Sequence, residues 1–109
     1  MVDYELNELR REFLAEAEAK VGEIQKALDD GRDSASLDRL AYLAHQLKGS
    51  GGSYGYERIS SEATEIEKAV EKMAAGAADE TTEAQVQQHV VNLRSEIQKS
   101  ARELATAPA

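Results

Sequence analysis

Hydrophobic residues recur along most of this chain at intervals of three and four positions, which is the spacing of one face of an α-helix. The pattern predicts four helical segments, at about residues 4–29, 36–52, 56–75 and 82–104. The apolar positions are Leu6, Leu9, Phe13, Ala17, Val21, Ile24 and Leu28 in the first segment, Leu37, Leu40, Ala44 and Leu47 in the second, Ile59, Ala63, Ile66, Val70 and Met73 in the third, and Val86, Val90, Leu93, Ile97, Ala101 and Leu104 in the fourth. Each segment therefore has one apolar face to bury.

Polar residues and glycines at the segment ends indicate where the helices begin and end. Asp3 is predicted to cap the first helix and Gly31 to stop it. The second helix is expected to start between residues 34 and 36. Thr82 and Gln85 have the spacing of a capping box, which predicts the start of the fourth helix.

No segment shows the alternating pattern of a strand. Four amphipathic helices with short connections favour an all-α fold, an antiparallel up-down-up-down four-helix bundle. The length of 109 residues predicts a single domain over residues 1–109. Only 5% of the residues are aromatic, and the single proline is Pro108, so the composition is also that of a helical bundle.

Charge and cysteine content exclude several classes of function. The net charge is −8, from 21 acidic and 13 basic residues, so binding to nucleic acid or to an anionic membrane surface is disfavoured. The chain has no cysteine, hence no disulfide and no thiolate metal site. No apolar run approaches the roughly 20 residues that span a bilayer, and the first residues do not resemble a signal peptide. We therefore expect a cytoplasmic protein, and a monomer.

The most informative stretch is residues 45–55, which read His-Gln-Leu-Lys-Gly-Ser-Gly-Gly-Ser-Tyr-Gly. In a helix, Lys48, Gly49 and Gly52 lie near His45 on one face, three, four and seven positions further on. Helix geometry also places His45 roughly 130° from the centre of the apolar face, on the solvent side. An imidazole beside a positive charge, with little bulk in front of it, suits a histidine that another protein contacts and that briefly carries a negative group.

The glycines in this stretch leave two interpretations open. Gly49, Gly51 and Gly52 would together cost a helix about 3 kcal/mol relative to alanine. Either the helix ends near Lys48, or small side chains are required there. From the residues alone, a surface histidine followed by a loop is as good an explanation as a functional site.

Three further residues could take part in chemistry or binding. Tyr42 is predicted to lie on the outward face near His45, where it could dock a partner, and Arg58 could steer an acidic partner. His89 flanks the apolar face of the fourth segment without lysine or glycine neighbours, so we expect a histidine at the bundle edge. A metal site that uses both histidines would need carboxylates converging on them and is disfavoured.

At these residues the chain resembles the histidine-containing phosphotransfer (HPt) domain family. The family pattern is His-x-Leu-Lys-Gly, then five residues and a glycine, and residues 45–49 and Gly55 match it without departure. The flanks are also similar, with Leu-Ala-Tyr-Leu-Ala at residues 40–44 and Tyr-Glu-Arg-Ile at residues 56–59. Together with the four helical segments, the resemblance covers nearly the whole chain.

The resemblance implies a function and a role for each site residue. Such domains accept a phosphoryl group from the phospho-aspartate of one receiver domain and pass it to the aspartate of another. His45 would be phosphorylated, Lys48 would stabilise the phosphoryl oxygens, and Gly49 would leave room for the partner. Gly52, on the same face as His45, is a further candidate for access, with packing as the alternative explanation. The family often has a glutamine or glutamate on the next helix that holds the imidazole, and the matching residue here is Glu67.

The prediction is thus a phosphocarrier in two-component signalling that is not an enzyme and needs no cofactor of its own. The expected partners are receiver domains of response regulators or of a hybrid histidine kinase, and the Mg²⁺ for transfer would lie among the receiver's carboxylates. Two alternatives stay open. The chain could be the phospho-acceptor domain of a larger, chemotaxis-type histidine kinase, or a helical adaptor that binds a partner without chemistry.

Overall fold

Four helices make up nearly all of the part of the chain that the structure, a computed structural model, describes, namely residues 3–31 and 33–106. The helices are α1 (Asp3–Asp29), α2 (Ser34–Ser53), α3 (Glu57–Ala74) and α4 (Glu80–Thr106). No strand occurs within those two ranges. The predicted all-α class and the four helical segments are therefore confirmed, with boundaries that shift by one or two residues.

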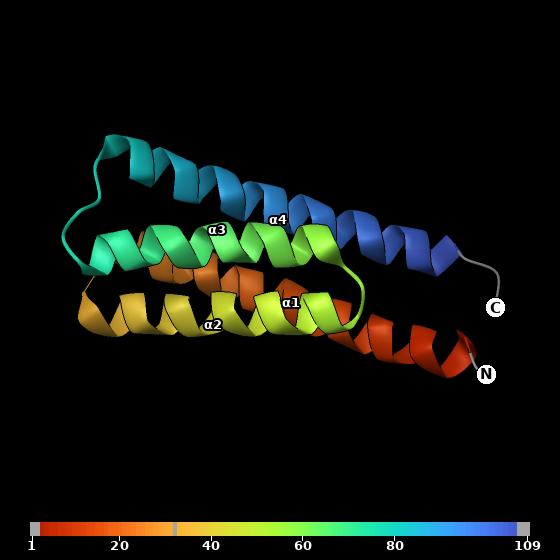
Figure 1. Cartoon of the computed structure of the whole chain (residues 1–109). Helices are drawn as coiled ribbons and strands as arrows, with labels where there is room; N and C mark the ends of the chain where they lie inside the picture. Colours follow the sequence, from red (N-terminus) through yellow and green to blue (C-terminus); the bar gives the residue numbers. More distant parts are fainter. Residues whose placement is uncertain (1–2, 32, 107–109) are drawn as a thin grey trace.

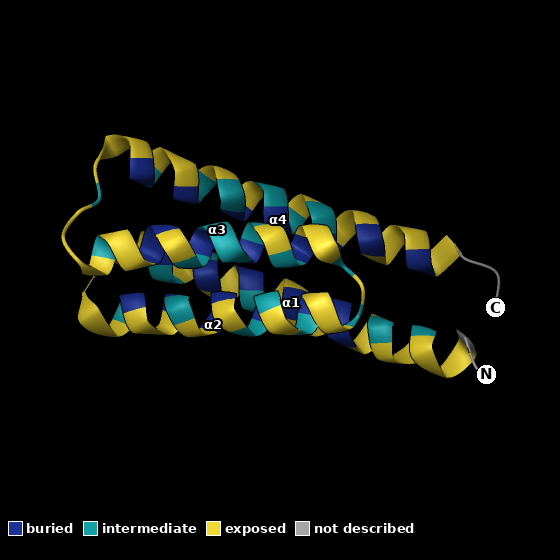
Figure 2. Cartoon of the chain, in the orientation of Figure 1, coloured by how far each residue is buried: buried dark blue, intermediate teal, exposed yellow. Residues whose placement is uncertain are grey.

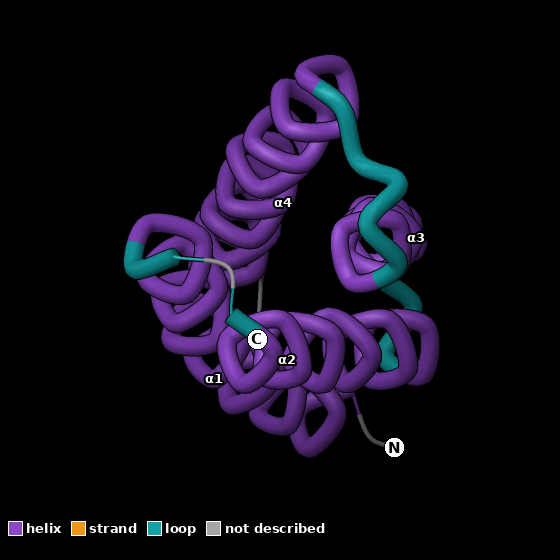
Figure 3. The backbone as a smooth tube through the Cα atoms, turned by 90° about the vertical axis from the view of Figure 1, so that its left-hand side faces the viewer, coloured by secondary structure: helices purple, strands orange, loops and turns teal. Residues whose placement is uncertain are grey.

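The helices form a bundle in which each one packs against two others. α1 lies against α2 and α4, and α3 likewise lies against α2 and α4. The bundle measures 48 × 20 × 20 Å. The α1–α2 and α3–α4 loops lie at one end and the α2–α3 loop lies towards the other (Figure 1). An end view shows the four helices around a common axis (Figure 3).

The core consists of the apolar faces of all four helices, as predicted, with three exceptions. Leu6 and Leu9 are 39% and 47% exposed, and Ala101 is exposed. These predictions were wrong because α1 and α4 extend past the end of α2 and α3, where an apolar face has fewer neighbours to bury it (Figure 2). Met73 is only partly buried. The core also contains three residues outside the predicted faces, namely Leu14, Leu43 and Ala69.

The two ends of α1 differ in how well the sequence predicted them. Asp3 is already helical rather than a cap before the helix, and its side chain lies outside the described part of the chain. At the other end α1 stops at Asp29, and Gly31 follows with a φ of +118°. Glycine adopts this left-handed region without strain, so the predicted stop is confirmed.

Aspartates cap α2 and α4, and at the start of α4 an aspartate takes the place of the predicted threonine. Asp33 accepts a hydrogen bond from the Ser36 backbone N–H (2.8 Å) at the start of α2. Asp79 accepts from the backbone N–H of Thr82 (2.9 Å) and from its hydroxyl (3.1 Å) at the start of α4. The predicted capping box of Thr82 and Gln85 is wrong, because Thr82 is buried inside the first turn. These hydrogen bonds lower the pKa of both aspartates below the usual 3.8.

The glycine-rich stretch is helical, so the interpretation that α2 ends near Lys48 is wrong. α2 continues to Ser53, and Gly51 is buried against the start of α3. A Cβ atom on Gly51 would lie 3.2 Å from both Cγ2 of Ile59 and the backbone nitrogen of Ser60. The short side chain is therefore required for the close approach of α2 and α3.

Aromatic residues close the end of the bundle where α2 turns into α3. Phe13 of α1 stacks on Tyr54 and Tyr56, with ring centroids 5.2 Å and 5.9 Å apart. Between the two tyrosines, Gly55 makes the turn with a φ of +85°. This cluster fixes the last turn of α2, in which the glycine-rich stretch lies.

Candidate functional site

His45 lies on the outer face of α2, as its helical position predicted. Its side chain is 69% exposed, whereas Ala44 and Leu47 on either side of it in sequence are fully buried. The two buried neighbours hold the helix against the core. The imidazole is therefore fixed at its base and reachable from solvent.

A carboxylate on α3 holds one edge of the imidazole. Nδ1 of His45 is 3.0 Å from Oε2 of Glu67, whose side chain is only 20% exposed. An ionised carboxylate can only accept a hydrogen bond, so Nδ1 carries the proton and donates it. The other ring nitrogen, Nε2, is then the one with a lone pair. The contact expected between these two residues is present.

Lys48 joins the same carboxylate from one helical turn further along α2. Its Nζ atom is 3.5 Å from Oε1 of Glu67, and its side chain is 44% exposed. One oxygen of the carboxylate thus contacts the imidazole and the other contacts the ammonium group. This arrangement fixes the ring and places a positive charge beside it.

Close packing of α2 on α3 brings these three side chains together. The Ser60 hydroxyl donates a hydrogen bond to the Lys48 carbonyl oxygen (2.9 Å), next to the contact that Gly51 allows. On α3, Ile66 beside Glu67 is fully buried. Glu67 therefore lies at the edge of the interface, where its carboxylate reaches across to α2.

Gly49 and Gly52 leave the surface beside His45 open. A Cβ atom on Gly49 would meet nothing within 4 Å, and one on Gly52 would meet only the Ser60 hydroxyl, at 3.8 Å. Neither glycine is required by packing inside the chain, in contrast to Gly51. Their effect is on the space in front of the imidazole, which an approaching molecule could use.

A surface hollow lies beside His45 between α1 and α2. Its lining consists of Lys20, His45, Gln46, Gly49, Ser50, Ser53 and Tyr54. Lys20 belongs to α1, and sequence reasoning missed it. No local pattern could have found it, because it is 25 positions from the histidine and approaches only when α1 packs on α2.

Tyr42 lies on the outward face near His45, and its ring is in contact with its neighbours on α2. It is 53% exposed. The hydroxyl accepts a hydrogen bond from the Gln46 side chain (2.8 Å), and the Arg39 guanidinium lies over the ring, 5.6 Å from its centroid. The ring is thus held in place while one face stays open. Its docking role stays a prediction.

Arg58 does not come near the imidazole. Its side chain is 77% exposed, and Nε is 3.8 Å from Oε2 of Glu96 on α4. Glu67 follows it by nine positions, which at about 100° per residue puts the two on opposite faces of α3. The predicted steering role stays untested, and it would act from the α4 side of the molecule.

His89 is the other histidine, and it lies at the edge between α3 and α4, as expected. Its Nδ1 atom is 2.7 Å from Oε1 of Glu62, and its side chain is 27% exposed. Within residues 3–31 and 33–106, no group of three or more His, Cys, Asp or Glu side chains is placed to hold a metal ion. In the same part of the chain, no helix is long and apolar enough to cross a membrane.

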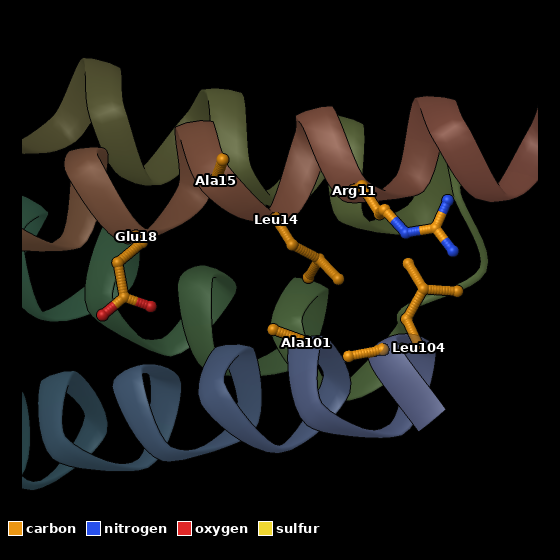
Figure 4. A pocket seen from close by; sticks show the side chains of 7 residues that line it. Arg11, Leu14, Ala15, Glu18, Ala101 and Leu104 are labelled. Carbon is orange, nitrogen blue, oxygen red and sulfur yellow. The ribbon is translucent and has the colours of Figure 1, made fainter. Parts of the chain in front are cut away.

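A second hollow, far more apolar, lies between α1 and α4. Figure 4 shows Leu14 and Leu104 facing each other across it, with Arg11 and Glu18 at its sides. It has no histidine or hydroxyl among its lining residues. The hollow therefore has no imidazole comparable with that of His45.

The family comparison agrees with the site at His45. A family model described as the Hpt domain matches residues 8–103, which is most of the chain and includes every residue of this site. No curated protein and no solved structure gives a match.

Proposed function

Because the chain belongs to the Hpt domain family, we propose that it carries a phosphoryl group on His45 between receiver domains of a two-component phosphorelay. Hpt domains are phosphocarriers rather than enzymes, and they interact with receiver domains. The donor would be the phospho-aspartate of one receiver and the acceptor the aspartate of another. The observation that carries the proposal is the exposed imidazole whose Nδ1 atom is held by Glu67.

The proposal gives each group at the site a part in the transfer. Neutral imidazole is a nucleophile near pH 7, and the Glu67 contact leaves the lone pair on Nε2. Nε2 attacks phosphorus in line with the leaving aspartate oxygen, and charge spreads over the equatorial oxygens. The Lys48 ammonium offsets part of that charge. Gly49 leaves room for the receiver to bring its aspartate to the ring.

The proposal includes the conditions under which the domain works. The Mg²⁺ needed for transfer belongs to the receiver's carboxylates, and the domain acts in the cytoplasm as a monomer. It folds as a single domain over residues 1–109, with the helices antiparallel in up-down-up-down order. The placement of the loops at alternate ends supports that order (Figure 1).

Transfer from purified receivers tests the proposal. Receivers phosphorylated with ³²P are mixed with the domain, and we expect label on His45 that is lost in acid and kept in base. His45→Gln should abolish labelling. The matched control is His89→Gln, which removes a histidine that also contacts a carboxylate, and this variant should label normally.

Two outcomes would contradict the proposal. If His45→Gln still accepts the label, another residue is the acceptor. If no receiver labels the wild-type domain, yet a receiver binds it and His45→Gln leaves that binding unchanged, the adaptor alternative is correct.

A further inference from the structure

We propose that Lys20 of α1 is a second phosphoryl-binding residue, which contacts the phosphoryl oxygens on Nε2 of His45 from the side opposite Glu67. This inference rests on the function proposed above and adds to it a residue from a different helix. It starts from the hollow between α1 and α2, in which Lys20 and His45 are both lining residues.

The direction of the imidazole decides where a phosphoryl group would lie. α2 packs between α3 on one side and α1 on the other. Nδ1 of His45 is held towards α3 by Glu67. The two ring nitrogens point to opposite edges of an imidazole, so Nε2 points away from α3. The hollow with Lys20 adjoins the ring on this other side.

The hollow is open at Gly49, which lines it together with Lys20 and His45. A Cβ atom on Gly49 would meet nothing within 4 Å. The Ser53 side chain also lines the hollow and adds a hydroxyl group. Lys20 is partly buried, and it makes no ion pair or hydrogen bond with any residue of the described ranges. Its ammonium group is thus available to a ligand.

Lys48 alone would not neutralise a phosphoryl group on His45, so a second cation would stabilise it. A phosphoryl group carries about −1.5 to −2 charges at neutral pH. Lys48 is 3.5 Å from the Glu67 carboxylate, which already offsets part of its positive charge. One partly neutralised ammonium group therefore faces nearly two negative charges. Lysine is a flexible point charge suited to phosphate oxygens, so Lys20 would supply the missing positive charge.

The phosphoryl transfer in which Lys20 acts needs no reactant besides the donor phospho-aspartate and His45. The Nε2 lone pair forms the N–P bond while the P–O bond to the donor aspartate breaks, and the electron pair of that bond returns to the aspartate as carboxylate. Nδ1 keeps its proton, which it donates to Glu67. Lys20 stays protonated throughout and contacts the equatorial oxygens. It takes no part in proton transfer.

Phosphorylation by a small donor tests Lys20 without a receiver. The probe is phosphoramidate, which transfers its phosphoryl group to histidine and releases ammonia. The variants are Lys20→Gln, Lys20→Arg and the matched control Lys26→Gln, which removes one exposed lysine from the same helix away from the His45 hollow. Initial rates are followed by ³¹P NMR at low and high salt.

We expect Lys20→Gln to slow phosphorylation of His45 about two- to fivefold at low salt, in the range of a partly exposed charge interaction. The loss should shrink at high salt, because salt screens exposed charges. Lys20→Arg should recover most of the rate, and Lys26→Gln should behave as wild type.

The result that overturns this inference is a Lys20→Gln rate equal to wild type, or equal losses in Lys20→Gln and Lys26→Gln. In either case His45 is still labelled, so the proposed phosphocarrier function stands. If instead wild-type His45 accepts no phosphoryl group from either phosphoramidate or receivers, both proposals fail together.

Discussion

Under the proposed function, a carboxylate beside a histidine is not sufficient to make a phosphorylation site. His89 has the same contact as His45, with Nδ1 2.7 Å from Glu62 compared with 3.0 Å from Glu67. The difference lies in the surroundings. His45 is far more exposed, and it has Lys48 and an open glycine surface next to it. At the scale of single residues, the proposed function would thus depend on the combination of a held ring, a nearby cation and free access.

Removing the Glu67 side chain should slow the chemistry without blocking it. In Glu67→Ala, Nδ1 loses its acceptor and the ring can rotate, so fewer imidazoles have Nε2 ready to attack. We expect the rate of phosphorylation by phosphoramidate to fall about fivefold, equivalent to about 1 kcal/mol for one hydrogen bond to a charged group that is partly exposed.

The control for this prediction is Glu62→Ala, which frees His89 in the same way and should leave the rate unchanged. A Glu67→Ala rate equal to wild type would show that the carboxylate does not orient the ring. In that case its contacts with His45 and Lys48 would serve only to join α2 to α3.

At the scale of the helix, the glycines of α2 serve two different ends. Gly51 faces α3 and is required by packing, whereas Gly49 faces solvent and meets nothing. Glycine in a helix interior costs about 0.5–1 kcal/mol relative to alanine. For Gly51, the close packing of α2 on α3 offsets that cost. For Gly49, no packing contact within the chain offsets the cost. We therefore interpret this glycine as one that keeps access to His45 open.

Alanine at each position separates these two effects. We expect Gly51→Ala to lower the free energy of unfolding by about 1–3 kcal/mol, because its Cβ would press on the α3 backbone. Gly49→Ala should raise it by up to about 1 kcal/mol. The same Gly49→Ala should slow transfer from a phosphorylated receiver but not from phosphoramidate.

Urea unfolding and the two phosphorylation assays measure these quantities. Equal rates of Gly49→Ala and wild type with every receiver would mean that the glycine has no part in access. A loss of rate with phosphoramidate as well would mean that alanine disturbs the imidazole itself.

The aspartate cap of α4 should make part of the stability depend on acid pH. Hydrogen bonding to Thr82 lowers the pKa of Asp79 from 3.8. Its contribution is therefore complete above 3.8 and is lost as the pH falls through the lower pKa of the folded state. Asparagine caps a helix about as well but does not titrate. We expect Asp79→Asn to match wild type near neutral pH and to lose less stability in acid.

Thermal unfolding measured across that pH range provides the test. If the melting temperatures of wild type and Asp79→Asn fall identically as the pH is lowered, the charge of this cap does not contribute to stability.

At the scale of the whole molecule, periodicity predicted which face of each helix is buried but not how far along the helix the burial continues. The exposure of His45 and most of the core followed from the spacing alone. The predicted burial of Leu6 and Leu9 was wrong because α1 and α4 have 27 residues each, whereas α2 and α3 have 20 and 18. At about 1.5 Å per residue, the longer pair extends past the shorter one by roughly 10 Å. Lys20 was missed for a related reason, since its position depends on how helices align.

The extension of α1 and α4 past α2 and α3 leads to the last prediction, which concerns Leu9 and Leu40. Both lie on predicted apolar faces, but Leu9 is 47% exposed and Leu40 is fully buried. Leu40→Ala should lower the free energy of unfolding by about 2–5 kcal/mol, as removal of a buried leucine side chain does. Leu9→Ala should cost less than about 1 kcal/mol, because little of its surface leaves water on folding.

Urea unfolding at several protein concentrations measures the loss in unfolding free energy for both variants. It also tests the prediction that the protein is a monomer. In a monomer, replacing a buried leucine by alanine lowers the free energy of unfolding by the same amount at every protein concentration. If Leu9→Ala proves as costly as Leu40→Ala, and the cost grows with protein concentration, then a second copy covers this end of α1 in solution and the monomer prediction is wrong. Because Leu9 lies near the end of α1 that extends past α2, whereas His45 lies more than two turns before the end of α2, Leu9→Ala should in either case accept phosphoryl groups from phosphoramidate at the wild-type rate.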